Sequence, residues 1–173
     1  MRLKNKKVIT VVAEQYNDLE LWYPIYRLRE EGATVDVAGE KANTVYKGQA
    51  GIPITTDYAF SDINADDYDG ILVPGGWAPD KLRRYPELLD IVKKMDEAKK
   101  TIGQICHAGW VLISADVIRG RKVTSTPAIK DDMMNAGATW VDEETVVDGH
   151  IISSRRPDDL PTNTKAYADK LAE

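Results

Sequence analysis

The 173-residue sequence contains one cysteine, two histidines and one phenylalanine. A single cysteine cannot form an internal disulfide, which suits a reducing compartment. Two histidines and one cysteine do not make a metal-ligand cluster, and nothing in the sequence implies an organic cofactor. We therefore expect neither a metal nor a cofactor.

The chain also lacks an excess of basic residues and a long apolar run. Its 28 acidic residues outnumber 23 lysines and arginines, and the formal net charge of −5 disfavours binding to a phosphate backbone. The apolar run near the N-terminus, Val8 to Ala13, is too short for a signal sequence or a membrane span. We expect a cytoplasmic protein with neither a nucleic-acid nor a membrane partner.

Strand and helix signals alternate along the chain. Val8 to Ala13 is typical of a strand buried on both faces, and a helix is expected from about Asp18 to Glu31, with Gly32 as its C-cap. Thr34 to Ala38 is the next expected strand. This order predicts an α/β fold, and the absence of a long linker predicts a single domain over residues 1–173.

Later segments continue the pattern. The expected elements are buried strands at Gly70–Val73 and Thr101–Ile105, helices at Pro86–Lys99 and from about Pro161 to Ala172, short antiparallel pieces at a sheet edge within Val45–Thr56, and a hairpin at Val146–Ile152. The hairpin carries an Asp-Gly turn, and His150 after it is expected to be exposed.

Cys106 stands where a predicted strand ends abruptly and helix-favouring residues begin. A tight turn at such a junction lifts the side chain above the sheet, as in a nucleophile elbow. A following helix places partial positive charge near the sulfur, so we expect a reactive thiolate with a pKa between about 4 and about 7. The alternative is a buried, inert cysteine.

Pro74-Gly75-Gly76 ends a different predicted strand. In an open α/β sheet, the carboxyl ends of the strands line one edge, where ligands bind. The backbone N–H groups of Gly75 and Gly76, together with that of His107, are candidates for an oxyanion hole. The alternative is an ordinary glycine-rich turn.

Glu20 lies in the first turn of the first predicted helix and has two interpretations. With Asn17 it resembles a capping box. Alternatively, its carboxyl group touches the sulfur of Cys106, in which case one of the two groups holds a proton because adjacent anions repel. His107 is a candidate proton carrier, although neighbours in sequence usually point in different directions.

Two tryptophans are candidate pocket residues. Trp77 directly follows the glycines, and Trp110 lies about one helical turn after Cys106. Large aromatic side chains beside the sulfur would exclude water and favour a small substrate. The alternative is that one or both belong to the core or to a subunit interface.

Together these segments resemble the PfpI/ThiJ superfamily, over nearly the whole chain. The resemblance rests on Asp18-Leu19-Glu20-Leu21, Val73-Pro74-Gly75-Gly76, Ile105-Cys106-His107, Ile129-Lys130-Asp131-Asp132 with Asn135-Ala136-Gly137, and Ser154-Arg155 with Pro157-Asp158-Asp159-Leu160. It implies a flavodoxin-like three-layer sandwich with a mostly parallel sheet and a nucleophile elbow. It also implies that Glu20 pairs with Cys106 and that the chain forms a homodimer or larger homo-oligomer.

The sequence departs from the protease branch of that superfamily at several positions. Asn17 replaces a second glutamate, and Thr126 replaces a tyrosine. The resemblance assigns the glutamate supplied by a neighbouring subunit to Asp80, a shorter carboxylate. Ala108 and Trp77 are further departures.

The resemblance implies a cysteine-dependent hydrolase or lyase of stress protection, like the superfamily's glyoxalases and deglycases. Its substrate would be a small reactive dicarbonyl or a glycated protein, with Cys106, His107, Glu20 and Asp80 as catalytic residues. Two alternatives stay open: an intracellular cysteine peptidase, and a non-enzymatic redox sensor or chaperone that uses an oxidisable Cys106. A glutamine amidotransferase is disfavoured, because no His-x-Glu pair is present.

Overall fold

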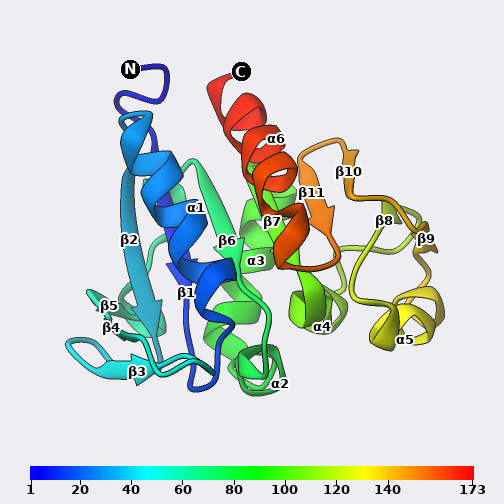
Figure 1. Ribbon diagram of the computed structural model, residues 1–173, viewed down its shortest axis with the longest axis horizontal. Helices are drawn as coiled ribbons and strands as arrows, with labels where there is room; N and C mark the ends of the chain where they lie inside the picture. The colour runs from blue at the N-terminus through cyan, green and yellow to red at the C-terminus, as the bar shows by residue number, and fades with distance from the viewer.

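The computed structural model describes residues 1–173 and contains a seven-stranded sheet in the order β10-β11-β7-β6-β1-β2-β5 (Figure 1). Every neighbouring pair is parallel except β10 and β11. The strands are β1 (Lys7–Val11), β2 (Thr34–Gly39), β5 (Tyr58–Ala59), β6 (Gly70–Val73), β7 (Thr101–Ile105), β10 (Thr145–Asp148) and β11 (Ile151–Ser154). The predicted mostly parallel sheet is confirmed.

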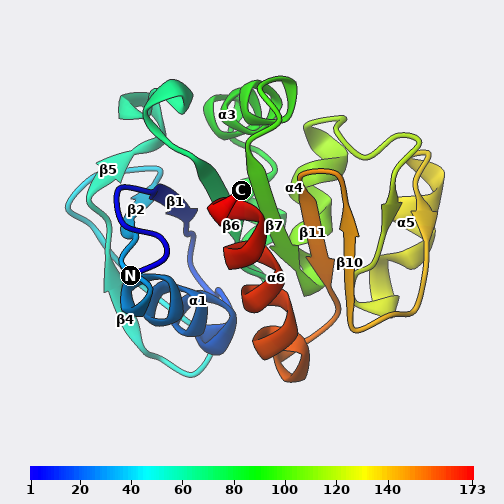
Figure 2. The same ribbon diagram turned by 90° about the horizontal axis from the view of Figure 1, so that it is seen from above.

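Helices cover both faces of this sheet. Figure 2 shows α1 and α6 on one face and α3 and α4 on the other. The helices are α1 (Asp18–Glu30), α2 (Ala78–Leu82), α3 (Pro86–Glu97), α4 (Gly109–Ser114), α5 (Lys130–Asn135) and α6 (Leu160–Ala172). The predicted α/β sandwich is thus confirmed. None of the helices combines the length and the apolar character that crossing a bilayer requires.

The remaining elements are short. Within Val45–Thr56, the expected antiparallel pieces form a separate two-stranded sheet, while β5 forms the edge of the main sheet. The short elements are β3 (Val45–Lys47), β4 (Pro53–Thr55), β8 (Lys122–Val123), β9 (Thr139–Trp140), and the 3-10 turns Phe60–Asp62, Ala65–Asp67, Cys106–Ala108, Pro127–Ile129 and Pro157–Asp159.

The two central strands β6 and β7 are buried along their whole length. They belong to a connected hydrophobic core of 44 buried residues, and helices on both faces account for the continuous apolar runs that the sequence shows there. Because β6 and β7 are parallel neighbours, their carboxyl ends lie side by side. The segments that follow them, which begin with Pro74 and Cys106, are thereby brought together.

The hairpin of β10 and β11 is confirmed, but the environment predicted for His150 is wrong. Gly149 takes the left-handed conformation of the turn, with φ of +62°. His150 is buried, and its Nε2 lies 2.7 Å from Oδ1 of Asp96, which also accepts a 2.8 Å bond from Arg121. The side chain turns inward because a carboxylate from α3, far away in the sequence, satisfies its ring nitrogen.

Candidate active site

Cys106 lies on the sharp turn between β7 and α4, as predicted for a nucleophile elbow. Its φ of +61° is in the left-handed region, which costs a residue with a side chain about 1–2 kcal/mol. The strand before it is fully buried, and a 3-10 turn at Cys106–Ala108 leads directly into α4. The strained backbone aims the partly buried sulfur away from the sheet into a pocket.

The pocket above Cys106 is small, with a volume of about 150 Å³. It is lined by Asn17, Glu20, Gln49, Gly76, Trp77, Cys106, His107 and Pro157. Five of the candidate site residues predicted from the sequence therefore meet at one place: Glu20, Gly76, Trp77, Cys106 and His107. A pocket of this volume suits a ligand of a few heavy atoms, since drug-sized ligands occupy about 300–1,000 Å³.

Glu20 lines this pocket, and of the capping box that was one of its two interpretations only the Asn17 half forms. Asn17 is the N-cap of α1, and its Oδ1 accepts hydrogen bonds from the N–H groups of Leu19 and Glu20 at 3.1 and 3.2 Å. The Glu20 side chain does not return to Asn17. Its Oε2 accepts a 2.8 Å bond from the N–H of Gly75. Burial raises the pKa of Glu20 to about 7, against the opposing effect of the hydrogen bond from Gly75 and of the neighbouring Cys106 side chain.

The loop after β6 supplies backbone donors to the sulfur. Gly76 forms an antiparallel bridge with Tyr16, and its φ of +75° together with a Cβ position only 2.4 Å from the backbone nitrogen of Asn17 requires glycine. The backbone N–H groups of Gly76 and His107 lie near the Cys106 sulfur and act to lower the pKa of the thiol. The geometry therefore fits an oxyanion hole made by these two groups. The N–H of Gly75 does not join them, because Glu20 accepts it.

The expected depression of the thiol pKa is wrong for this arrangement. Burial and the charge of the Glu20 carboxylate raise the pKa of Cys106 to about 12, while the N–H groups of His107 and Gly76 lower it. The helix α4 spans only six residues, so its dipole adds little against the desolvation of the sulfur. A raised thiol pKa favours the protonated form, so formation of the thiolate calls for a base.

His107 reaches the sulfur even though it is the next residue in the chain. Its Nδ1 lies 3.3 Å from Sγ of Cys106, and burial lowers the pKa of the imidazole. The ring lies between two indoles, with its centroid 5.2 Å from both Trp77 and Trp110. No carboxylate of this chain hydrogen-bonds or pairs with His107, so one chain holds no complete Cys-His-acid triad.

The two predicted pocket tryptophans have different positions. Trp77 lines the pocket and is 52% exposed at its mouth. Trp110 does not line it, contrary to the prediction, because the ring of His107 lies between its indole and Trp77. Asp80 does not line the pocket either; it is exposed on α2 and pairs with Arg84 at 2.8 Å. Its expected role across a subunit interface stays a prediction.

Two pocket residues were missed by the sequence reasoning. Gln49 belongs to the loop between β3 and β4, where its N–H donates to the carbonyl of Tyr16 at 2.9 Å. The buried carboxylate of Asp18 anchors that loop by accepting the N–H groups of Ala50 and Ile52 at 2.7 and 3.0 Å. An aspartate in the first turn of a helix has an ordinary role there, so its sequence position gave no signal for this contact.

Pro157 is the other missed residue. Two positions before it, Arg155 forms two bonds from its guanidinium to the carboxylate of Asp159, at 2.9 and 3.1 Å. This pairing fixes the turn that brings Pro157 to the pocket wall. This segment is one of those on which the family resemblance rests, but the sequence did not indicate that it belongs to the site.

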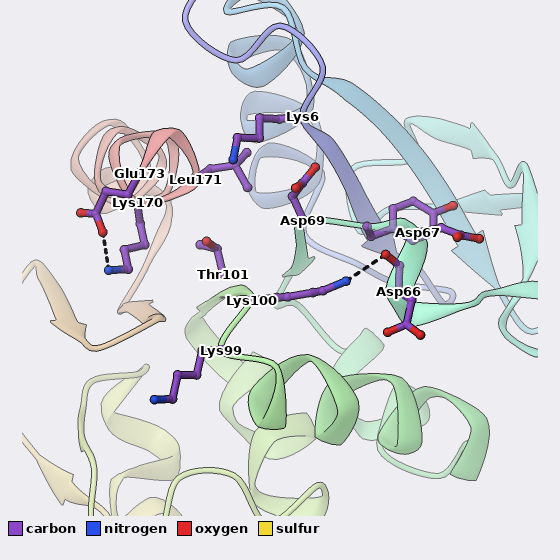
Figure 3. Close-up of a pocket in the computed structure, with 11 residues that line it drawn as sticks. Lys6, Asp66, Asp67, Asp69, Lys99, Lys100, Thr101, Lys170, Leu171 and Glu173 are labelled. Carbon is purple, nitrogen blue, oxygen red and sulfur yellow. Dashed lines mark hydrogen bonds and ion pairs between the residues drawn. The ribbon is translucent and has the colours of Figure 1, made fainter.

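A larger pocket of about 390 Å³ lies at the opposite end of the same strands (Figure 3). It contains residues that precede β1, β6 and β7, such as Lys6, Asp69 and Lys100, together with the end of α6. The ammonium group of Lys100 donates to the carbonyl oxygens of Ala65 and Asp66 at 2.7 and 3.1 Å. This pocket holds no cysteine or histidine, and we do not assign the chemistry to it.

The sequence model of the DJ-1/PfpI family matches residues 6–170. Among characterised sequences, the chain is 47% identical over 154 residues to a deglycase of Pyrococcus abyssi, covering 89% of this chain and 92% of the relative. Deglycase PfpI of Pyrococcus furiosus is 42% identical with the same coverage. YraA of Bacillus subtilis, named as a candidate cysteine protease, is 37% identical over 90% of this chain and 92% of its own.

Solved structures show the same similarity. A two-domain protein of Anabaena variabilis, with DJ-1/ThiJ/PfpI-like and ferritin-like domains, superposes with a TM-score of 0.95 at 39% identity, over 96% of this chain and 48% of that one. DJ-1beta of Drosophila melanogaster superposes with a TM-score of 0.90 at 26% identity, over 96% and 90% of the two chains.

Proposed function

Because this chain belongs to the DJ-1/PfpI family, we propose that it is a cysteine-dependent enzyme that consumes small reactive dicarbonyls, such as methylglyoxal, and thereby removes their early adducts from proteins. The observation that carries this proposal is the surroundings of the Cys106 sulfur. Two backbone N–H groups, a buried carboxyl group and an imidazole converge on it in a pocket of about 150 Å³.

The pocket selects its substrate by size. A three-carbon dicarbonyl fits the small volume below Trp77, whereas a folded polypeptide does not. The aldehyde oxygen then lies near the N–H groups of Gly76 and His107, which act on the sulfur in the free protein. These fixed dipoles stabilise the negative charge that develops on that oxygen when sulfur attacks the carbon.

The nucleophile forms by proton transfer inside the pair. The raised pKa of Glu20, about 7, leaves a substantial fraction of carboxylate near neutral pH, and this carboxylate can accept the thiol proton. The neutral imidazole of His107, 3.3 Å from the sulfur, is the second available base. Transfer to Glu20 avoids two adjacent anions, because the proton stays between the two groups, whereas transfer to His107 avoids them only when Glu20 is already protonated.

The remaining steps conserve all atoms of the substrate and one water. Attack of Cys106 on the aldehyde gives a hemithioacetal. Removal of the proton from its C1 carbon gives an enediol, and protonation at C2 gives the thioester of lactic acid. Water then hydrolyses the thioester, which releases lactate and restores the thiol. Glu20 and His107 carry these protons. Early hemiaminal adducts on protein amines release free dicarbonyl reversibly. When the enzyme consumes the free dicarbonyl, the equilibrium shifts and the adducts dissociate.

The deciding experiment measures the conversion of methylglyoxal to lactate by proton NMR. We expect turnover by the wild-type protein and none by Cys106→Ala. A wild-type protein that produces no lactate, or a Cys106→Ala variant with full activity, would overturn the proposal. A glycated model peptide run beside free methylglyoxal then tests the removal of adducts.

A redox sensor is the second candidate, and one observation favours it. Oε1 of Glu20 is buried and has no hydrogen-bond partner, so it is free to bond an oxygen placed on the adjacent sulfur. Peroxide would oxidise the thiol to sulfenic and then sulfinic acid. Mass spectrometry after graded peroxide would show sulfinate at Cys106 in wild type. If lactate production is absent while this oxidation is efficient, the sensor is favoured over the enzyme.

A peptidase is less well supported by this chain. His107 has no carboxylate partner to orient it, and the pocket is too small for an extended peptide backbone with its side chains. Such an activity would require an acid from another subunit. A casein digestion assay with Cys106→Ala as the blank tests it directly.

A further inference from the structure

The ring of His107 is oriented by aromatic contacts rather than by an acid. In a nucleophile–base pair, a third group usually bonds the far nitrogen of the imidazole and fixes its orientation. Here only Nδ1 has a partner, the sulfur of Cys106. The tilts of 47° and 59° to the two flanking indoles, with ring centroids 5.2 Å apart, are in the range that aromatic pairs prefer.

The two indoles are not equally fixed. Trp110 donates its Nε1–H to Oδ2 of Asp132 at 2.9 Å, and the guanidinium of Arg83 lies over its ring, 5.5 Å from the centroid. Arg83 is held in turn by a 2.9 Å bond from its Nε to Oγ of Ser114. Trp77 is 52% exposed, and its indole N–H has no partner in the chain. Trp110 is therefore the more firmly held of the two indoles that flank His107.

We propose that Trp110, anchored by Asp132, is a positioning residue that holds the imidazole of His107 against the sulfur of Cys106. This rests on the proposed role of Cys106 as the nucleophile. The indole takes over the orienting task that a carboxylate performs in a Cys-His-acid triad. It adds no charge beside the sulfur, and the imidazole stays neutral and able to accept the thiol proton.

Loss of the Trp110 indole frees the His107 side chain to adopt other rotamers. The separation of Nδ1 and Sγ then varies, and the base loses its fixed approach to the thiol. The consequence is a smaller fraction of thiolate near neutral pH, and hence slower alkylation, without any loss of a charged group. The effect passes through His107 alone, which separates it from a general loss of packing.

The test is the rate at which iodoacetamide alkylates Cys106 between pH 6 and 9, in conditions where each variant is folded by circular dichroism. We expect Trp110→Leu to slow alkylation at pH 7 by roughly 3- to 10-fold. Asp132→Ala is expected to slow it in the same direction. Asp132→Asn, which keeps an oxygen to accept the indole N–H, is expected to restore the wild-type rate.

A matched control is available in Trp140. It is also partly buried, donates one indole N–H, to Ser125 at 3.0 Å, and has a cation over its ring, Lys130 at 5.2 Å. It does not contact His107, so Trp140→Leu should leave the alkylation profile unchanged. Equal slowing by Trp140→Leu would overturn the proposal, because the effect would then be one of packing.

The combination with His107→Ala is the decisive comparison. If Trp110 acts through the imidazole, Trp110→Leu has no further effect on alkylation once His107 is alanine. Additive effects of the two substitutions would overturn the proposal. Alkylation needs no dicarbonyl, so this result stands whether or not the protein turns over methylglyoxal.

Discussion

The N–H group of Gly75 donates a 2.8 Å hydrogen bond to Oε2 of Glu20, which links the loop after β6 to the first turn of α1. This bond holds a carboxyl group beside the Cys106 thiol in a place where only 3% of the glutamate is exposed. Because two adjacent anions repel in such a site, the protonation of one group depends on the other. The pH behaviour of the protein follows from this pair.

The thiol pKa should fall when the Glu20 charge is removed. Burial and the Glu20 carboxylate raise the pKa of Cys106, to about 12, so we expect alkylation of the wild type to accelerate only well above neutral pH. Glu20→Gln removes the negative charge and should move the alkylation midpoint to lower pH. The opposite result would be a wild-type midpoint below neutral pH that does not move in Glu20→Gln. It would show that Glu20, and not Cys106, holds the shared proton.

The same glutamate should make the free energy of unfolding depend on pH. Burial raises the pKa of Glu20 from 4.5 to about 7 in the folded state, so the folded state binds more protons between these values. Wild-type stability therefore falls as the pH rises from about 4.5 to about 7, by up to about 3 kcal/mol. The free energy of unfolding of Glu20→Gln, minus that of the wild type, should therefore increase from pH 4.5 to about pH 7. Above pH 7 this difference should stay constant.

Urea unfolding at pH 4.5, 6, 7 and 8 measures this difference. Glu30→Gln is the control, because it removes an exposed carboxylate from the same helix. If the Glu20→Gln advantage is the same at pH 4.5 and pH 8, the carboxyl group of Glu20 does not titrate in this window.

Gly75 should be intolerant of a methyl group for steric reasons alone. A Cβ there would lie 2.4 Å from Oε2 of Glu20 and 2.7 Å from Cβ of Cys106. We expect Gly75→Ala to destabilise the protein by about 1–3 kcal/mol and to change the alkylation rate. Gly120→Ala, at an open surface position with φ of +75°, should lower the melting temperature without affecting Cys106. Normal reactivity in Gly75→Ala would contradict the close packing of this pair.

Trp77 should control which substrates reach the sulfur. Its indole is 52% exposed at the mouth of the pocket, so Trp77→Ala should widen the approach with little loss of stability. We expect the turnover of methylglyoxal, divided by the turnover of a bulky glycated peptide, to fall in this variant. Trp140→Ala is the control for the loss of an indole elsewhere. An unchanged ratio combined with a lower melting temperature would assign Trp77 to packing.

The local pattern of the sequence was sufficient for the sheet and the elbow, because buried strands and sharp turns have local signatures. The strand ends and the family resemblance predicted that Glu20 and the glycine loop meet Cys106, but individual hydrogen-bond partners between distant segments were not predictable. His150 meets Asp96, 54 residues away, and Glu20 meets Gly75, 55 residues away. The thiol pKa was mispredicted for a related reason: the helix after Cys106 is visible in the sequence, but the burial that outweighs its dipole depends on the packed fold.

Asp80 should act across a subunit interface. Within one chain it pairs with Arg84 and does not line the Cys106 pocket, while the family resemblance assigns it to the acid supplied by a neighbouring subunit. We expect Asp80→Ala to reduce dicarbonyl turnover to background without changing the melting temperature. Arg84→Ala, which removes the ion pair but keeps the carboxylate, should remain active.

Mixing two inactive variants gives the sharpest test of this role. In an oligomer of Asp80→Ala with Cys106→Ser, a subunit that keeps Cys106 can receive Asp80 from its neighbour, so co-expression should restore activity that neither variant shows alone. Sedimentation velocity on the same sample should show a dimer or a larger assembly. A fully active Asp80→Ala variant, or a fully active monomer, would remove Asp80 from the mechanism. Mixed oligomers without activity would place its effect within one subunit.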